Sequence, residues 1–215
     1  MEFTTRDEVK NVYERRAAWY DLTANLYYLL GFREQAYRRR AAEALAVGPG
    51  DAVVEIGCGT GLNFALIERR IGAGGRLIGV DLTQAMLDGA RRRVVANDWR
   101  NVELVCTPAA EFRFPAQVDA VLSTFALTLE PDFEAVIAEA ARALKPGGRF
   151  VLLDLKIPDG WLGRLAPLLL PLVRPFAVSM AVARRQPWRA MERHFAQVRR
   201  SGLYFGIAYL AVGVR

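Results

Sequence analysis

Three glycines at alternate positions, Gly57, Gly59 and Gly61, follow a short apolar run that contains Glu55. The run at 51–56 is rich in β-branched residues and comes after a Gly-Pro-Gly turn, so we predict a buried strand there. Glycine lets a loop adopt unusual backbone conformations and lets a ligand lie against the main chain. Between a strand and a helix, such a loop predicts a nucleotide-type site, with a tight structural turn as the alternative.

Asp81 ends a second apolar run, twenty-four positions after Gly57. A carboxylate at the tip of the second strand of an α/β sheet is placed to accept hydrogen bonds from both ribose hydroxyls of a bound nucleotide. The glycine loop and this aspartate, taken alone, fit a dinucleotide enzyme equally well.

A third element is the turn Leu-Lys-Pro-Gly-Gly at 144–148, which precedes another apolar run at 150–154. The glycine loop, Asp81 and this turn together resemble the class I S-adenosylmethionine (SAM)-dependent methyltransferase family, over about residues 45–156. The resemblance implies an α/β, Rossmann-like fold with a mostly parallel seven-stranded sheet and helices on both faces. It also implies SAM as cofactor and S-adenosylhomocysteine as product.

The resemblance assigns the cofactor contacts residue by residue. The glycine loop is expected to lie against the methionine part of SAM, and Asp81 to bind the ribose. Pro108 stands where the family often has an aspartate, so the backbone of Ala109 is expected to contact the adenine. Core packing is the alternative role for Met86. The expected cofactor residues are Tyr20, Glu55, Gly57, Gly59, Gly61, Asn63, Asp81, Leu82, Met86, Ala109 and Ser123.

The stretch from Trp19 to Tyr28 resembles the N-terminal Tyr-Asp helix of two groups in this family. One group comprises the ubiquinone and menaquinone C-methyltransferases, and the other the bacterial phospholipid N-methyltransferases. Tyr20 and Tyr27 are seven positions apart and share a helical face. Aromatic rings stabilise an ammonium group by roughly 0.5–2 kcal/mol per contact. We expect both tyrosines on the substrate side of the site. A quinone ring would stack on them as well as an ammonium group would, so they do not decide between the two groups. Core packing is the alternative role for Tyr20.

His194 is the only histidine and the third candidate for a catalytic role, as a proton acceptor. Its alternatives are a structural role, or contact with a head-group phosphate beside Arg189 or Arg193. The two cysteines lack metal-ligand spacing, so no metal is expected, and their number favours a reducing compartment.

Two features favour a membrane surface. The insertion at 158–187 is apolar, interrupted by prolines and arginines, and too short to span a bilayer. It suits a membrane interface or a lipid groove, with a buried lid as the alternative. The net charge of +6 comes almost entirely from arginine, which anionic lipids attract and which genome composition also explains. The absence of an Asn/Asp-Pro-Pro-Tyr/Phe tetrad at 123–126 disfavours nucleic acid.

At 215 residues, the chain is expected to form one domain, 1–215, in which residues 1–46 form a helical lid. Predicted helices cover 5–21, 24–46, 60–71, 84–96 and 132–143, and predicted strands cover 51–56, 76–80, 102–106, 117–123 and 149–155. Residues 193–200 and 203–212 are expected to add an antiparallel pair. No apolar leader is visible at the N-terminus, which favours a cytoplasmic protein on the inner face of the membrane.

These patterns predict a SAM-dependent methyltransferase that acts on a lipid head-group amine, above all phosphatidylethanolamine, at an anionic membrane surface. Methylation of a quinone ring carbon, methylation of a water-soluble small molecule and SAM binding without catalysis stay open as alternatives. The sequence leaves the oligomeric state open.

Overall fold

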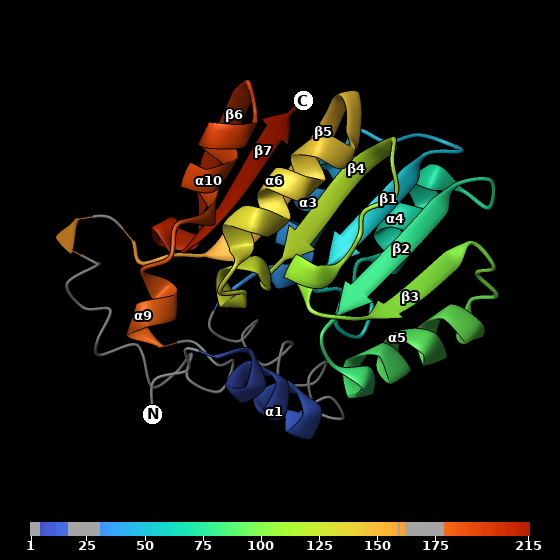
Figure 1. The fold of residues 1–215 in the computed structure, drawn as a ribbon, viewed down its shortest axis with the longest axis horizontal. Helices are drawn as coiled ribbons and strands as arrows, with labels where there is room; N and C mark the ends of the chain where they lie inside the picture. Colours follow the sequence, from blue (N-terminus) through green and yellow to red (C-terminus); the bar gives the residue numbers. More distant parts are fainter. Residues whose placement is uncertain (1–4, 17–30, 159, 162–178) are drawn as a thin grey trace.

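A computed structural model describes residues 5–16, 31–158, 160–161 and 179–215 of the chain. Its centre is a seven-stranded sheet with strand order β3-β2-β1-β4-β5-β7-β6 (Figure 1). The strands are β1 (Ala52–Ile56), β2 (Arg76–Asp81), β3 (Val102–Cys106), β4 (Val118–Thr124), β5 (Leu144–Leu155), β6 (Gln197–Leu203) and β7 (Ala208–Val214). The first five strands are parallel, and β7 is antiparallel to both β5 and β6.

The strand order changes direction between β1 and β4, which lie side by side although two strands separate them in sequence. In an open parallel sheet, the connections after two such strands run to opposite faces and leave a crevice at their carboxyl ends. The fold therefore places a ligand site after Ile56 and Thr124, where these two strands end.

Helices cover both faces of the sheet. The described helices are α1 (Arg6–Arg16), α3 (Glu34–Ala44), α4 (Phe64–Ile71), α5 (Gln84–Ala96), α6 (Phe133–Ala143), α9 (Met180–Ala183) and α10 (Pro187–His194), with short 3-10 turns η3 (Ala109–Glu111), η4 (Leu127–Leu129) and η6 (Tyr204–Gly206). Helices α6 and α10 pack on one face, while α3, α4 and α5 pack on the other. Helix α1 covers neither face, and Figure 1 shows it beyond the arrowheads of β1, β2 and β4.

The core consists of two apolar layers, one on each face, and this explains the sequence of the central strands. In β1, Val54 and Ile56 pack toward α6, whereas Val53 packs toward α4. Strands that are buried on both sides read as continuous apolar runs rather than as alternating ones. The α6 layer includes Trp188 and the fully buried Tyr209.

The Rossmann-like fold predicted from the sequence is confirmed, and helix 84–96 and strand 102–106 have the predicted bounds. Helix α4 begins later than predicted because the glycine loop continues through turns to Asn63. Strand β5 begins earlier than predicted, since Leu144 already pairs with Val118 across a bulge.

The antiparallel pair at the end of the chain is also confirmed, but both strands begin later than predicted. Strand β6 begins at Gln197 because α10 continues to His194, and β7 begins at Ala208 because η6 separates the two strands. Both cysteines are free. Within the described ranges, no helix is long and apolar enough to cross a membrane. Most of the predicted insertion at 158–187 and residues 17–30 of the predicted lid lie outside the described residues.

Candidate cofactor site

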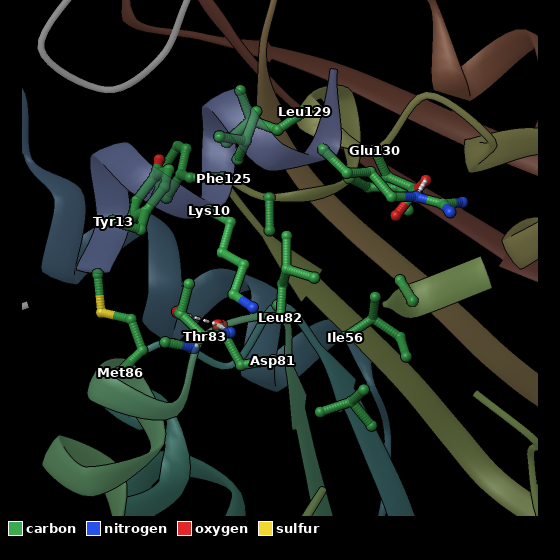
Figure 2. Close-up of a pocket in the computed structure, with 18 of the residues that line it drawn as sticks. Lys10, Tyr13, Ile56, Asp81, Leu82, Thr83, Met86, Phe125, Leu129 and Glu130 are labelled. Carbon is green, nitrogen blue, oxygen red and sulfur yellow. Dashed lines mark hydrogen bonds and ion pairs between the residues drawn. The ribbon is translucent and has the colours of Figure 1, made fainter. Parts of the chain in front are cut away.

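A pocket lies at the carboxyl ends of β1, β2 and β4, between the strand ends and α1 (Figure 2). Its empty volume is about 780 Å³, including space open to solvent. The described residues that line it are Arg6, Val9, Lys10, Tyr13, Ile56, Gly57, Gly59, Val80, Asp81, Leu82, Thr83, Met86, Thr107, Ala109, Thr124, Phe125, Ala126, Leu127, Leu129 and Glu130. The pocket thus occupies the crevice that the strand order predicts.

The glycine loop forms the floor of this pocket, and two of its glycines are required for different reasons. Gly57 has a φ of +67°, and a Cβ atom there would lie 2.2 Å from the Cβ of Ala126. Gly59 has a φ of +54°, but no atom lies within 4 Å of where its Cβ would be. A side chain at Gly59 would project into open space beside the pocket, so this glycine leaves room for a ligand at the backbone.

Asp81 is held at the tip of β2 by three hydrogen bonds. Its Oδ2 accepts from the Gly59 backbone N–H at 2.8 Å, and its Oδ1 accepts from the N–H and hydroxyl of Thr83 at 3.0 and 2.8 Å. Burial raises the pKa of Asp81, and the hydrogen bonds from Thr83 and Gly59 oppose that rise. A fixed, partly desolvated carboxylate in this position is suited to accept hydrogen bonds from paired hydroxyls.

Helix α1 closes the pocket from the solvent side through Val9, Lys10 and Tyr13, and Figure 2 shows the Lys10 side chain pointing toward the strand end that carries Asp81. The helix is attached by Arg6. Its guanidinium contacts Glu130 at 2.9 Å, Asp132 at 2.6 Å and Glu111 at 3.6 Å, and the Glu130 side chain is only 9% exposed. Three carboxylates from two loops therefore hold one end of α1 over the pocket.

Replacement of Arg6 by alanine is expected to loosen α1 and to weaken SAM binding about three- to tenfold. Partly buried charge-assisted contacts contribute roughly 1–3 kcal/mol to the attachment of α1, and only part of this loss is passed on to the ligand beneath the helix. Calorimetric titration with SAM measures this change. Arg76→Ala is the matched control, since it removes an exposed ion pair with Glu103. Arg76 begins β2, so this pair lies at the end of the strands away from the pocket. Equal SAM affinities of the two variants would show that the Arg6 contacts do not hold the lid.

A buried polar network supports the glycine loop from below. Glu55 is fully buried; its Oε1 accepts from the Asn63 side-chain amide at 2.5 Å, while its Oε2 has no hydrogen-bond partner among the described residues. Asn63 and Arg38 both donate to the Thr124 hydroxyl, at 2.9 and 2.6 Å. Burial raises the pKa of Glu55 to about 7, against the opposing effects of Asn63 and Arg38. This network connects the loop to α3.

Six of the expected cofactor residues line the pocket: Gly57, Gly59, Asp81, Leu82, Met86 and Ala109. Four others do not. Glu55 and Asn63 face the α3 side and belong to the buried network, and Gly61 packs against the ring of Phe64, 2.7 Å from where its Cβ would lie. Ser123 is fully buried, and its hydroxyl has no hydrogen-bond partner in the described part of the chain, while its neighbour Thr124 reaches the pocket.

Of the expected catalytic residues, His194 lies away from the pocket. It ends α10, with Nε2 4.0 Å from Glu134 of α6, on a helix pair that packs against one face of the sheet. The expectation that it acts in the site is not supported by this placement. Tyr20 and Tyr27 lie outside the described residues.

Two parts of the pocket wall were not predicted from the sequence. One is the α1 face with Val9 and Tyr13, whose four-residue spacing marks a helical face without showing what covers it. The other is the segment from Phe125 to Glu130 after β4. Phe125 has a φ of +55°. This conformation could not be predicted from the sequence, because left-handed positions usually hold glycine or asparagine rather than phenylalanine.

Comparisons with known proteins agree with this geometry. The family described as "Methyltransferase domain" matches residues 53–148. The demethylmenaquinone methyltransferase of Listeria monocytogenes is 31% identical over 165 residues, covering 75% of this chain and 68% of that protein. The chain belongs to the class I SAM-dependent methyltransferases.

Two further proteins extend this comparison. The 2-phytyl-1,4-naphtoquinone methyltransferase of Synechococcus elongatus is 32% identical to this methyltransferase over 165 residues, or 74% of this chain and 68% of that one. The structure of Haemonchus contortus phosphoethanolamine N-methyltransferase 2, with S-adenosylhomocysteine, has a TM-score of 0.64 at 22% identity. It covers 77% of this chain and 38% of that chain, and at this identity it shows the fold alone.

The pocket of this methyltransferase fits SAM. The open space beside Gly59 admits a ligand at the backbone, and Asp81 offers acceptors to a ribose. Leu82 and Met86 provide apolar surface on the α5 side of the pocket. When bound, SAM supplies an electrophilic methyl group that is transferred in line to a nucleophile, so the protein's task is chiefly to position the partners and exclude water.

Among the described residues, no cluster of His, Cys, Asp and Glu could hold a metal ion.

Proposed function

We propose that this methyltransferase methylates a ring carbon of a reduced naphthoquinone. The observation that carries the proposal is the 31–32% identity to two quinone methyltransferases over 165 residues. This identity supports a ring carbon, the alternative predicted from the sequence, better than it supports the lipid head-group amine.

The pocket wall beyond the strand ends supports an aromatic acceptor. Tyr13 and Phe125 each contribute an aromatic side chain, and Leu127 and Leu129 add aliphatic surface from η4 (Figure 2). A flat apolar ring gains free energy when it leaves water for such a wall, and aromatic pairs add about 0.5–1.5 kcal/mol beyond the area that they bury. The wall would therefore orient a quinol ring by stacking and burial.

Of the two described cations that line the pocket, Arg6 and Lys10, the first gives little support to a phosphate-bearing head group. Arg6 lines the pocket, but its guanidinium is held by Glu130, Asp132 and Glu111. A phosphodiester would have to compete with these carboxylates, because each contact to Arg6 is already charge-assisted. The residues expected to surround an ammonium group, Tyr20 and Tyr27, lie outside the described residues.

A comparison of acceptors tests the proposal. Purified protein is incubated with deuterated-methyl SAM and either reduced 2-phytyl-1,4-naphthoquinone or phosphatidylethanolamine vesicles, and the lipids are extracted for mass spectrometry. The proposal predicts label in the naphthoquinone, with the methyl group on a ring carbon by NMR. Label on the nitrogen of phosphatidylethanolamine would establish the amine function instead, and an unlabelled extract from a SAM-binding protein would exclude both.

A further inference from the structure

Four aromatic side chains form a continuous line from the cofactor pocket to the protein surface; we name this line the aromatic row. Its members, in order from the pocket outward, are Phe125, Phe32, Tyr204 and Phe205. The successive ring centroids are 5.8, 5.3 and 5.5 Å apart. Phe125 lines the pocket, whereas Phe205 at the other end is 83% exposed.

The topology of the sheet explains why these residues meet. Phe125 follows the last residue of β4, and Tyr204 and Phe205 lie in the connection from β6 to β7. Ala208, the first residue of β7, pairs with Leu155 at the carboxyl end of β5. The connection therefore lies at the carboxyl ends of the parallel strands, as the pocket does, and the row runs across these strand ends.

Three of the four members have backbone conformations that are unfavourable for aromatic residues. The φ angles of Phe125, Tyr204 and Phe205 are 55°, 43° and 55°. Left-handed conformations of residues other than glycine cost free energy and persist where the surroundings fix them, often at functional sites. Here the Ile207 N–H donates to the Tyr204 carbonyl at 3.0 Å, and the Lys156 N–H donates to the Ile207 carbonyl at 2.8 Å.

Packing within the protein accounts for the inner part of the row but not for its tip. Phe32 and Phe125 pack against the apolar layer on the α3 side, and Phe32 also contacts Tyr37 at 5.3 Å. Phe205 contacts Tyr204, yet most of its ring is in water. A strained and exposed phenylalanine that continues an apolar line out of a pocket suggests a ligand along that line.

We propose that the aromatic row binds the apolar chain of the acceptor, which extends from the reacting ring in the pocket to Phe205 at the surface. This inference rests on the proposed function for the identity of the ring, since a phytyl-substituted naphthoquinone carries both parts in one molecule. The row begins inside the pocket and ends at the exposed ring of Phe205, so it suits a chain attached to the reacting group. Removal of such a chain from water provides the affinity.

The test compares the binding of 1,4-naphthoquinone with and without a phytyl chain. Binding is measured, in the same detergent solution, through the quenching of tryptophan fluorescence by the quinone. The variant is Phe205→Asn, because asparagine adopts the left-handed conformation more readily than phenylalanine and the fold should be retained. The control is Val95→Asn. Val95 is 74% exposed in the last turn of α5, at the opposite edge of the sheet.

We expect the wild-type protein to bind the phytyl compound at least about tenfold more tightly than the chainless one, and Phe205→Asn to lose most of this preference. Binding of the chainless quinone and of S-adenosylhomocysteine should not change, and Val95→Asn should resemble wild type. An undiminished preference in Phe205→Asn, or none in wild type, would overturn the inference. If the preference for the phytyl compound depends on Phe205 but neither quinol is methylated, the aromatic row still binds an apolar chain, and the proposed function is wrong.

Discussion

Replacement of Asp81 by alanine is expected to lower SAM affinity by about two orders of magnitude. The carboxylate is fixed at the tip of β2 by Gly59 and Thr83 and lines the pocket beside the glycine loop. If it accepts from both ribose hydroxyls, two hydrogen bonds to a charged group are lost, at about 1.5 kcal/mol each or more. The measurement is calorimetric titration with SAM and with S-adenosylhomocysteine.

The control for this variant is Asp88→Ala, which removes an exposed aspartate of α5 that pairs with Arg91. Asp81→Ala also removes the hydrogen bonds to Thr83, so thermal unfolding is recorded for both proteins. A folded Asp81→Ala protein whose SAM affinity stays within twofold of wild type would show that Asp81 is not the ribose-binding group.

Gly57→Ala is expected to have the largest effect on the fold. The new Cβ would lie 2.2 Å from the Cβ of Ala126, and the residue would keep a φ of +67° that alanine tolerates poorly. Relief of this clash requires the loop to move away from the segment after β4. We expect a loss of about 3 kcal/mol in the free energy of unfolding and of measurable SAM binding. Urea denaturation gives the first value.

Two other variants separate the clash from the backbone strain. Gly59→Ala has open space around its Cβ, so it should cost only about 1 kcal/mol of stability while still weakening SAM binding. The double variant Gly57→Ala with Ala126→Gly removes the contacting methyl group and should recover part of the lost stability. Similar stabilities for Gly57→Ala and Gly59→Ala would contradict the role assigned to Ala126.

The order and type of the central elements could be predicted from the sequence because local patterns determine them. Helix α5 and strand β3 show clear helical and strand patterns, and both have the predicted bounds. The start of β5 could not be predicted, because Leu144 joins the sheet through pairing with Val118, which is distant in sequence. The end of the glycine loop at Asn63 likewise depends on hydrogen bonds made within the turns.

Pocket residues could be predicted from the sequence where the residue type itself is required, but not where the direction of the side chain decides whether a residue reaches the pocket. Gly57 and Asp81 mark their positions through residue type, since a close contact requires glycine and a ribose requires an acceptor. Glu55 has a similarly suggestive position, yet its side chain points to the α3 side. Both faces of β1 are buried, so the sequence contains no alternation that would show this. The lid contact of Arg6 joins residues more than a hundred positions apart.

The most direct test of the cofactor site is hydrogen–deuterium exchange of the wild-type protein with and without S-adenosylhomocysteine. If the pocket beneath α1 is the cofactor site, the ligand should slow exchange in the glycine loop at 57–61, in the segment 81–86 and in α1. Exchange in α10 around His194 should not change. Slower exchange at α10 with no effect on the glycine loop would contradict this assignment of the site, because the cofactor would then bind elsewhere on the fold.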